Sequence, residues 1–299
     1  MIPASELILR PNGAVYHLDL LPGQVAETII TVGDPERVAQ VSRRFDRVEL
    51  RVEAREFVTH TGELGGRRLT VISTGIGTDN VDIVLNELDA LFNIDLGRRE
   101  IRNEFTELTF LRLGTSGSFQ PDLPLDSFLL SETALGLDGL LAFYPPPDAP
   151  DPLTVALVKH LDRAGTHLPV PPLLARPRLP ILDWSLIPAM ARGITLTAAG
   201  FYAPQGRSLR LPSGMSPRLL TALREFRHDD LRITNIEMET AGIYGLATAL
   251  GHRSASLSAL LANRAQGTFS RQPAATVERL IDQGLLLLVG IGAADAVDE

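Results

Sequence analysis

Short apolar runs that end in glycine, serine or threonine recur along the chain. One runs from Leu108 to Leu113 and passes directly into Gly114–Ser118. Such a run is typical of a buried strand in a parallel sheet, and its small residues predict a turn at the carboxyl end. Ligands of open α/β sheets bind just beyond these ends. Three predicted turns that follow strands are therefore candidate ligand contacts: residues 33–37, 74–78 and 114–117.

Segments with helical periodicity alternate with the predicted strands. The periodicity predicts helices over 36–45, 79–92, 153–164, 217–227, 240–250 and 273–293. Strands are expected over 28–32, 69–73, 108–114, 125–131, 194–199, 233–236 and 254–261, with a β-meander over 48–75. Alternation of this kind predicts an α/β fold with a three-layer α/β/α sandwich.

Two kinds of segment interrupt this alternation. Residues 94–107 are charged and are expected to form a surface excursion, and residues 144–152 and 169–180 are rich in proline and predict rigid connections. Strands continue on both sides of these segments, so no domain boundary is expected there. We therefore predict a single domain over residues 1–299.

Composition excludes several classes of function. The net charge of −8 argues against a nucleic-acid surface or a polybasic membrane patch, and the absence of cysteine excludes disulfides and thiolate chemistry. Residues 1–11 lack the pattern of a signal peptide, and the longest apolar run, 284–294, is shorter than the roughly 20 residues that cross a bilayer. A cytoplasmic protein without membrane contact is expected.

Two arginines lie at the predicted strand ends. Arg37 lies in the first turn of a helix that follows Gly33-Asp34-Pro35, where the helix dipole disfavours a cation unless an anion is near. Arg112 lies inside an apolar run and needs a partner there. Arginine and backbone N–H groups suit phosphate, so Arg37, Arg112 and Thr115 indicate an oxyanion site. The alternative is an ordinary strand in which Arg112 faces solvent or a core carboxylate.

Glu237-Met238-Glu239 lies where a short strand meets a helix. We do not interpret the two carboxylates as an acid/base pair of the glycosidase type. A carboxylate at this position complements the helix dipole, which is one interpretation. The other is that Glu239 accepts hydrogen bonds from two vicinal hydroxyls, such as those of a ribose.

Motifs along most of the chain resemble the nucleoside phosphorylase/uridine phosphorylase family. They are GDPERV at 33–38, REF at 55–57, STGIG at 73–77, RLGTSG at 112–117, EMETAGIYG at 237–245 and NR at 263–264. The segment FYAPQGR at 201–207 resembles the uracil-recognition segment of the uridine phosphorylase branch. The resemblance implies a nucleoside phosphorylase-like three-layer fold with a mixed central sheet.

The resemblance also implies roles for individual residues. Phosphate would be bound by Gly33, Arg37, Arg112, Thr115 and, from a neighbouring subunit, Arg55. Ribose would be bound by Met238, Glu239, Glu237 and a neighbouring subunit's His17. The base would be bound by Phe201, Gln205, Arg207 and Arg264. Arg112, Glu239, Gln205 and Arg207 would act on the reacting groups.

The activity implied by the resemblance is phosphate-dependent cleavage of uridine to uracil and ribose 1-phosphate. The alternatives are a purine nucleoside phosphorylase or nucleosidase of the same fold, and a non-catalytic nucleoside-binding protein. Ala262 occupies the position that matches the catalytic aspartate of the purine branch, which disfavours purine cleavage.

The resemblance further implies a homo-oligomer, a dimer or a hexamer of dimers. It implies no metal in the catalytic site, and inorganic phosphate is a co-substrate. A monovalent cation between subunits is left open: Glu56 and Ile76 match its ligands, but the turn after Gly77 departs from the family pattern.

Overall fold

The computed structural model describes residues 1–145, 149–180, 184–186 and 190–294. In this part of the chain, twelve strands form one mixed sheet and a further pair forms a small hairpin. The strands are β1 (Thr28–Val32), β2 (Arg47–Ala54), β3 (Phe57–Leu64), β4 (Arg67–Ser73), β5 (Ile94–Asp95), β6 (Glu100–Ile101), β7 (Thr109–Ser118), β8 (Phe128–Leu137), β9 (Leu173–Ala175), β10 (Ala191–Ala198), β11 (Arg227–His228), β12 (Leu231–Glu237), β13 (Arg253–Asn263) and β14 (Thr268–Phe269). The α-helices are α1 (Pro35–Ser42), α2 (Thr78–Asn93), α3 (Pro152–Arg163), α4 (Pro217–Glu225), α5 (Thr240–Ala249) and α6 (Pro273–Ala294).

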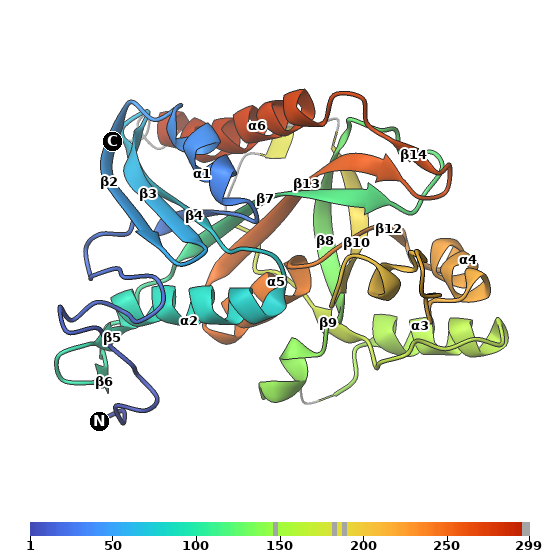
Figure 1. Cartoon of the computed structure of the whole chain (residues 1–299), viewed down its shortest axis with the longest axis horizontal. Coiled ribbons are helices and arrows are strands. Elements are labelled where there is room, and N and C mark those ends of the chain that lie inside the picture. The colour runs from blue at the N-terminus through green and yellow to red at the C-terminus, as the bar shows by residue number, and fades with distance from the viewer. Residues whose placement is uncertain (146–148, 181–183, 187–189, 295–299) are drawn as a thin grey trace.

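The central sheet has two parallel groups of strands that run in opposite directions. β4, β1, β7 and β13 are parallel neighbours, and so are β8, β10 and β12, while β13 pairs with β8 in antiparallel register. β12 also pairs with β7, with Ile236 opposite Gly117. The five strands β7, β13, β8, β10 and β12 therefore close into a ring. Ring closure brings the end of β12 next to β7, although the two strands are far apart in the sequence (Figure 1).

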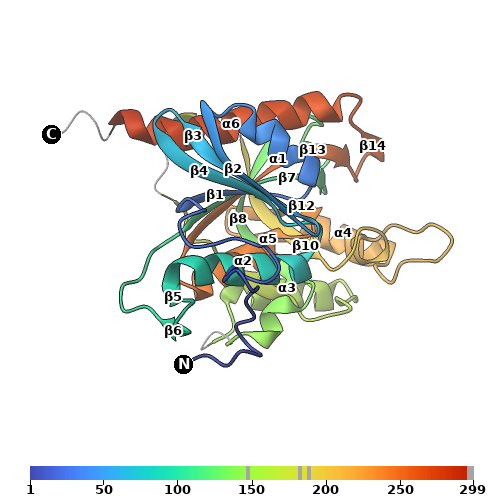
Figure 2. The same ribbon diagram turned by 60° about the vertical axis from the view of Figure 1, so that its left-hand side comes forward.

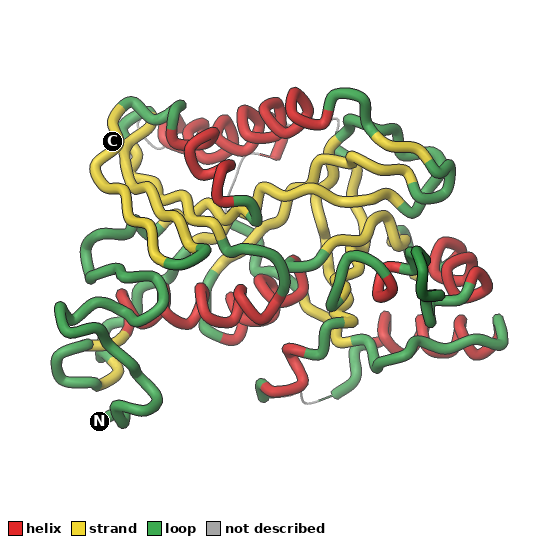
Figure 3. Tube along the Cα trace, in the orientation of Figure 1, coloured by secondary structure: helices red, strands yellow, loops and turns green. Residues whose placement is uncertain are grey.

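Helices cover both faces of the sheet, which confirms the predicted α/β fold. α6 and α1 lie on one side, and α2 and α5 lie on the other (Figure 2). α3 and α4 pack against each other beside β12, at the end of the molecule opposite the β2–β4 meander (Figure 3). No helix in the described ranges is both long enough and apolar enough to cross a membrane.

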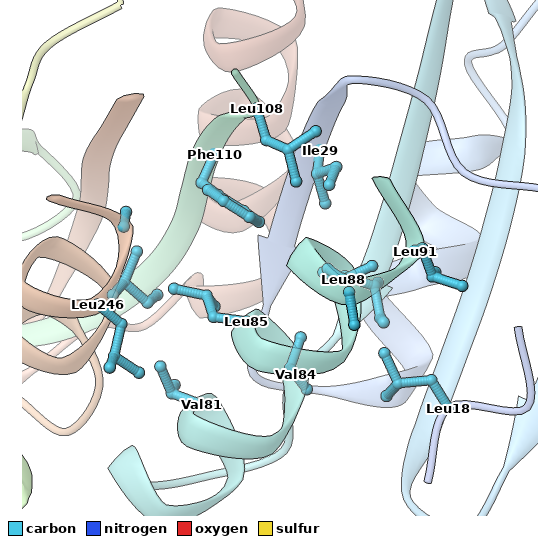
Figure 4. Close-up of a cluster of buried hydrophobic side chains, with 14 of the residues drawn as sticks. Leu18, Ile29, Val81, Val84, Leu85, Leu88, Leu91, Leu108, Phe110 and Leu246 are labelled. Carbon is cyan, nitrogen blue, oxygen red and sulfur yellow. The ribbon is translucent and has the colours of Figure 1, made fainter. Parts of the chain in front are cut away.

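The apolar stripe of α2 holds this helix against the sheet. Its buried side chains point toward Ile29 of β1, Phe110 of β7 and Leu246 of α5 (Figure 4). The members of the stripe are Val81, Val84, Leu85, Leu88 and Leu91. Each buried aliphatic side chain contributes roughly 1.5–3 kcal/mol, so the position of the α2 N-terminus is well determined by packing.

The predicted turn at 114–118 is wrong, because β7 continues through Gly114 to Ser118. The small residues there serve close packing rather than a turn: the segment pairs with β13 along its length and with β12 at its end. Only two of the three expected strand-end turns are therefore turns, those after β1 and β4.

Smaller differences concern the irregular segments. The excursion at 94–107 contains the β5–β6 hairpin, and the second proline-rich connection contains β9, which pairs with β8. Residues 146–148 of the first proline-rich connection lie outside the described residues. The prediction of a single domain over 1–299 stays a prediction.

Candidate active site

Arg112 lies between two glutamates at the place where β7 meets the end of β12. Its Nη2 is 2.6 Å from Oε2 of Glu239 and 2.9 Å from Oε2 of Glu237. All three side chains are buried, with 4%, 6% and 3% of Arg112, Glu239 and Glu237 exposed. The two carboxylates converge because β12 ends at Glu237 and Glu239 is the N-cap of α5, where the chain changes direction. The site is thus a buried cation held by two carboxylates.

Glu237 is fully engaged by protein donors besides Arg112. Its Oε1 accepts a 2.6 Å hydrogen bond from Oγ1 of Thr197, and its Oε2 accepts bonds of 2.9 Å from the backbone N–H groups of Glu239 and Thr240. The carboxylate therefore caps α5 and ties it to the end of β10.

Glu239 is held less completely. Its Oε1 accepts a 2.8 Å hydrogen bond from the backbone N–H of Gly77, the N-cap residue of α2. Gly77 has φ +100°, a conformation that favours glycine. The STGIG turn therefore contributes a backbone donor to the site, and Glu239 links β7, α2 and α5.

The guanidinium of Arg112 occupies the space above Gly114. A Cβ atom on Gly114 would lie 2.0 Å from Nη1 and 2.3 Å from Cζ of Arg112. Nη1 also contacts the hydroxyls of Ser256 and Ser258 on β13, at 3.4 and 3.5 Å. Gly114 is therefore required for the position of the arginine.

Burial and charge act in opposite directions on this group of residues. Burial lowers the pKa of Arg112, but Glu237 and Glu239 outweigh it, and the net pKa is raised above its ordinary value. Burial raises the pKa of Glu239, and the nearby charge of Glu237 raises it further. Arg112 lowers it, but the pKa of Glu239 is still above its ordinary value. The arginine is thus a permanent cation, and Glu239 is a carboxylate that burial makes easier to protonate.

Arg37 approaches the same site from α1. The helix begins after Asp34, which caps Glu36 N–H, and Pro35 occupies the first turn, as the sequence predicts. Arg37 Nη1 donates to the carbonyl of Leu113 at 3.2 Å, while its buried Nε has no hydrogen-bond partner among the described residues. Burial lowers the pKa of Arg37, and nearby Arg112 adds to this. An anion would satisfy this donor.

Gly33 and Thr115 flank the two arginines. Gly33 follows β1, and a Cβ atom there would lie 3.5 Å from the carbonyl of Gly75, so two strand-end turns approach each other closely. Thr115 lies three residues past Arg112 on β7 and is half-buried. Met238, between the two glutamates, is also half-buried.

A second cluster forms after β10, where Gln205 and Arg207 lie side by side. Arg207 Nη1 donates to Oε1 of Gln205 and to the carbonyl of Phe201, both at 2.6 Å. Its guanidinium carbon lies 3.9 Å from the centroid of the Phe201 ring, a cation–π contact. Gln205 is 2% exposed and Phe201 is 52% exposed, so the cluster presents an aromatic ring beside a buried amide.

Arg264 connects this cluster to β7. Its backbone N–H donates to the carbonyl of Ser118. Its Cγ and Cδ atoms lie over Gly117, and a Cβ atom on Gly117 would be 3.3 Å from them. Burial lowers the pKa of Arg264 to about 10, with Arg207 contributing, and Nη1 is buried without a partner in the described ranges. Gly117 is five residues beyond Arg112, roughly 16 Å along the strand. One strand therefore spans both clusters.

Within the described part of the chain, His17 and Arg55 form their side-chain contacts with residues outside these clusters. His17 Nδ1 is 2.5 Å from Oε1 of Glu87 on α2. Arg55, at φ +56° in the exposed turn between β2 and β3, lies over the ring of Tyr16 at 5.2 Å. Tyr16 in turn meets the His17 ring edge-on at 5.0 Å. The two residues predicted to serve a neighbouring subunit thus share one surface.

Sequence reasoning missed several residues that build the site. Ser256 and Ser258 alternate along β13, and this period of two was a signal that one face of the strand is polar. Thr197 and Glu87 had no comparable signal, because each acquires its meaning from a partner distant in the sequence. The role of Gly114 as space for Arg112 was likewise invisible, since it resembled a turn residue.

Comparisons with known proteins identify the family of the chain. Residues 27–283 match a family model described as the phosphorylase superfamily. The chain is similar to the uridine phosphorylase of Thermococcus kodakarensis, with 29% identity over 274 residues that cover 90% of this chain and 84% of that protein. It is similar to the uridine phosphorylase of Haemophilus influenzae, with 26% identity over 277 residues, 92% of this chain and 96% of that protein.

Among solved structures, the fold resembles a nucleoside phosphorylase of Trypanosoma brucei whose crystal structure is described as showing uridine phosphorylase activity. The TM-score is 0.83 and the identity is 26%, over 95% of this chain and 99% of that one. The predicted resemblance to the nucleoside phosphorylase fold is confirmed.

Proposed function

Because the chain belongs to the phosphorylase superfamily, whose enzymes include pentosyltransferases, we propose that it is a uridine phosphorylase. It would cleave uridine with inorganic phosphate to uracil and ribose 1-phosphate. The observation that supports this base specificity is the pair formed by buried Gln205 and Arg207 beside Phe201. An amide and a guanidinium offer the mixed donors and acceptor that the imide edge of uracil requires. The names of the similar proteins point the same way.

Phosphate is assigned to the end of the site that holds Arg37 and Arg112. Two guanidinium groups with an unsatisfied buried N–H suit a dianion. The backbone of Gly33 and the hydroxyl of Thr115 would add neutral donors. The alternative interpretation, that Arg112 pairs with a carboxylate in the core, also describes the structure, because Arg112 contacts Glu237 and Glu239. An ion pair with these carboxylates and a contact with phosphate are compatible if the carboxylates orient the guanidinium toward the phosphate.

Ribose is assigned to Glu239 and Met238. Glu239 keeps capacity for hydroxyl donors, since its two oxygens each accept one strong bond within the protein, from Gly77 N–H and Arg112. The prediction that Glu237 also binds ribose stays a prediction. Its oxygens accept from Thr197, the backbone of α5 and Arg112, so the role we propose for it is to orient Arg112.

The reaction follows from this arrangement. A phosphate oxygen forms the bond to the anomeric carbon as the bond to the uracil nitrogen breaks, the electron pair of that bond leaves with uracil, and the sugar has cationic character in the transition state. The carboxylate of Glu239 stabilises that charge, while Gln205, Arg207 and Arg264 stabilise the negative charge on departing uracil. The protein thus acts by positioning and electrostatics, without a side-chain nucleophile.

The enzyme is proposed to be a homo-oligomer. Arg55, Tyr16 and His17 contact one another on one surface of the chain. A neighbouring subunit would place Arg55 at the phosphate and His17 at the ribose, as the family resemblance implies. Oligomer size and the monovalent cation stay predictions.

The experiment that tests the function measures uridine consumption with and without phosphate, with inosine in parallel. We expect uracil release that depends on phosphate and little or no cleavage of inosine. Release without phosphate would identify a hydrolase and leave the arginines unexplained. Inosine cleavage in place of uridine cleavage would overturn the assignment of Gln205 and Arg207.

Gln205→Ala is expected to lower kcat/KM for uridine by about a hundredfold, because the partly buried Arg207 also loses its partner. The measurement compares this variant with Tyr202→Phe, which changes an exposed neighbour of the same loop. Residual phosphorolysis of any purine nucleoside serves as the internal reference. An equal loss on both substrates would assign Gln205 a structural role only.

A further inference from the structure

Asp138, directly after β8, binds the beginning of α2. Its Oδ2 accepts a 2.8 Å hydrogen bond from Oγ1 of Thr78, the first residue of the helix, and a 3.0 Å bond from the backbone N–H of Leu140. Its Oδ1 is buried and has no hydrogen-bond partner in the described part of the chain. A Cβ atom on Gly136 would lie 2.7 Å from this Oδ1, so the carboxylate folds back over the end of β8. Asp138 therefore connects the end of β8 to a helix that begins 60 residues earlier.

Tertiary contacts determine where α2 begins, because no side chain caps the helix. Its N-cap residue is Gly77, which has no side chain that could accept from the first N–H groups. Thr78 packs closely against α5, since a Cβ atom on Gly242 would lie 2.8 Å from Cγ2 of Thr78. The hydroxyl of Thr78 thus contacts Asp138 and its methyl group contacts α5, and the two contacts together hold the first turn.

The residue next to Thr78 contacts the candidate active site. The backbone N–H of Gly77 donates to Oε1 of Glu239 at 2.8 Å, and this oxygen has no other donor among the described residues. Hydrogen bonds of this kind are about 2.7–3.2 Å long, so a shift of Gly77 by roughly 1 Å would break the bond. Gly77 and Thr78 are neighbours in the chain. A displacement of the first turn of α2 would therefore also move the donor of Glu239.

We propose that Asp138 is a positioning residue for Glu239: by holding Thr78 it keeps the N–H of Gly77 within hydrogen-bond distance of Oε1, which fixes the direction of the carboxylate toward the sugar. This inference rests on the proposed function, in which Glu239 stabilises positive charge on the sugar. Loss of the bond between Asp138 and Thr78 should slow the chemical step and leave the binding of phosphate at the arginines almost unchanged.

The pH profile of kcat reports on the same contact. Burial raises the pKa of Glu239, whereas the charge of Arg112 and the hydrogen bond from Gly77 lower it. Losing that hydrogen bond raises the pKa of Glu239 further, so the carboxylate takes up its proton at a higher pH. The charged groups that face Glu239, which are Arg112, Glu237 and Arg37, are unchanged in the variants described below. The acidic limb of the kcat profile should therefore move to higher pH.

The test compares Thr78→Val with Thr78→Ser in the whole protein, with uridine and phosphate as substrates. Valine keeps the volume of threonine but lacks the hydroxyl. We expect it to lower kcat by about tenfold, to change KM for phosphate by less than about twofold, and to move the acidic limb to higher pH. Serine keeps the hydroxyl without the methyl group, so its kcat and its pH profile should resemble those of the unmodified enzyme.

Two further variants and a control complete the test. Asp138→Ala should reproduce the effects of Thr78→Val, and the double variant should lose no more kcat than the more affected single variant, because the two residues act as one unit. If Asp138→Ala does not fold, the comparison of valine with serine at Thr78 decides. Thr154→Val changes a half-buried threonine in the first turn of α3 and should leave kcat, KM and the pH profile unchanged.

The outcomes separate this inference from the proposed function. The role of Asp138 would be overturned, while the reaction itself stood, by an unchanged kcat in Thr78→Val, by a lower kcat with an unmoved acidic limb, or by equal losses of kcat with valine and with serine. A merely structural contact would lower the melting temperature of Thr78→Val without changing kcat per folded enzyme. Failure of the unmodified enzyme to release uracil from uridine with phosphate would overturn the proposed function, and this inference with it.

Discussion

Arg112→Ala is expected to lower kcat/KM for uridine phosphorolysis by about a thousandfold, mainly through weaker binding of phosphate in the transition state. The variant loses the cation that lies 2.6 Å from Glu239, and with it the charge that would balance phosphate beside two carboxylates. Steady-state kinetics with varied phosphate measures the effect. Phosphate kinetics like those of the unmodified enzyme would remove Arg112 from the phosphate site.

The same variant should also lose about 3–5 kcal/mol of stability, because Glu237 and Glu239 remain buried without their cation. The pKa of Glu239 is already raised by burial, and losing Arg112 raises it further. A carboxyl whose pKa is higher in the folded state binds its proton more tightly there, so the folded state gains stability as pH falls. The variant should therefore recover part of its loss as pH falls toward the ordinary pKa of a glutamate, which a series of unfolding curves at decreasing pH measures.

Three companion variants separate charge from geometry. Arg112→Lys keeps the positive charge but lacks the planar guanidinium that binds an anion with two N–H groups. Its kcat/KM should lie between the values of the unmodified enzyme and of Arg112→Ala. Gly114→Ala leaves Arg112 in the sequence but places a methyl group where its guanidinium lies, so it should reproduce most of the phosphate defect. Arg192→Ala, which removes a half-exposed arginine of β10, is the matched control.

Glu239→Gln is expected to lower kcat by about a hundredfold to a thousandfold with a smaller effect on phosphate binding. The substitution keeps the shape and an acceptor oxygen but removes the negative charge that would stabilise the cationic sugar. It also weakens the bonds from Arg112 and from Gly77 N–H. Single-turnover measurements with saturating phosphate and uridine would isolate the chemical step.

Glu237→Gln is the informative comparison for this variant. If Glu237 only orients Arg112 and caps α5, its loss should act through stability and phosphate binding, with kcat less affected. Equal effects of both substitutions on kcat would contradict the separate roles assigned to the two carboxylates.

Local pattern predicted much of the fold. The helix over Pro35–Ser42 follows from the Asp34 cap and Pro35, and the helix over Thr78–Asn93 follows from its apolar stripe. These features depend on neighbours within a few residues, which is why the sequence contains enough information to predict them. The prediction of a turn at Gly114–Ser118 was wrong because small residues occur both in turns and where strands pack closely, and the local pattern does not distinguish the two.

For the candidate site, too, some features could be predicted from the sequence and others could not. Its residue types and their order along the chain, from Arg37 and Arg112 to Glu239 and Arg264, were sufficient to identify the family and to propose phosphate, sugar and base contacts. The convergence of Glu237 and Glu239 on Arg112 was not predictable. It depends on the pairing of β12 with β7, which joins residues more than a hundred positions apart.

The sequence by itself therefore determined the family, the α/β class and the set of candidate residues, because motifs and periodicity are local properties. Only the tertiary structure decided which groups share an ion pair, that Gly114 provides the space for Arg112, and that Glu87 holds His17. The ion pair depends on the closure of the strand ring, which also turns the guanidinium of Arg112 over Gly114, and the contact of Glu87 with His17 depends on the packing of α2. The partners in the ion pair and in the Glu87–His17 contact are distant in the sequence, so the local pattern does not mark them.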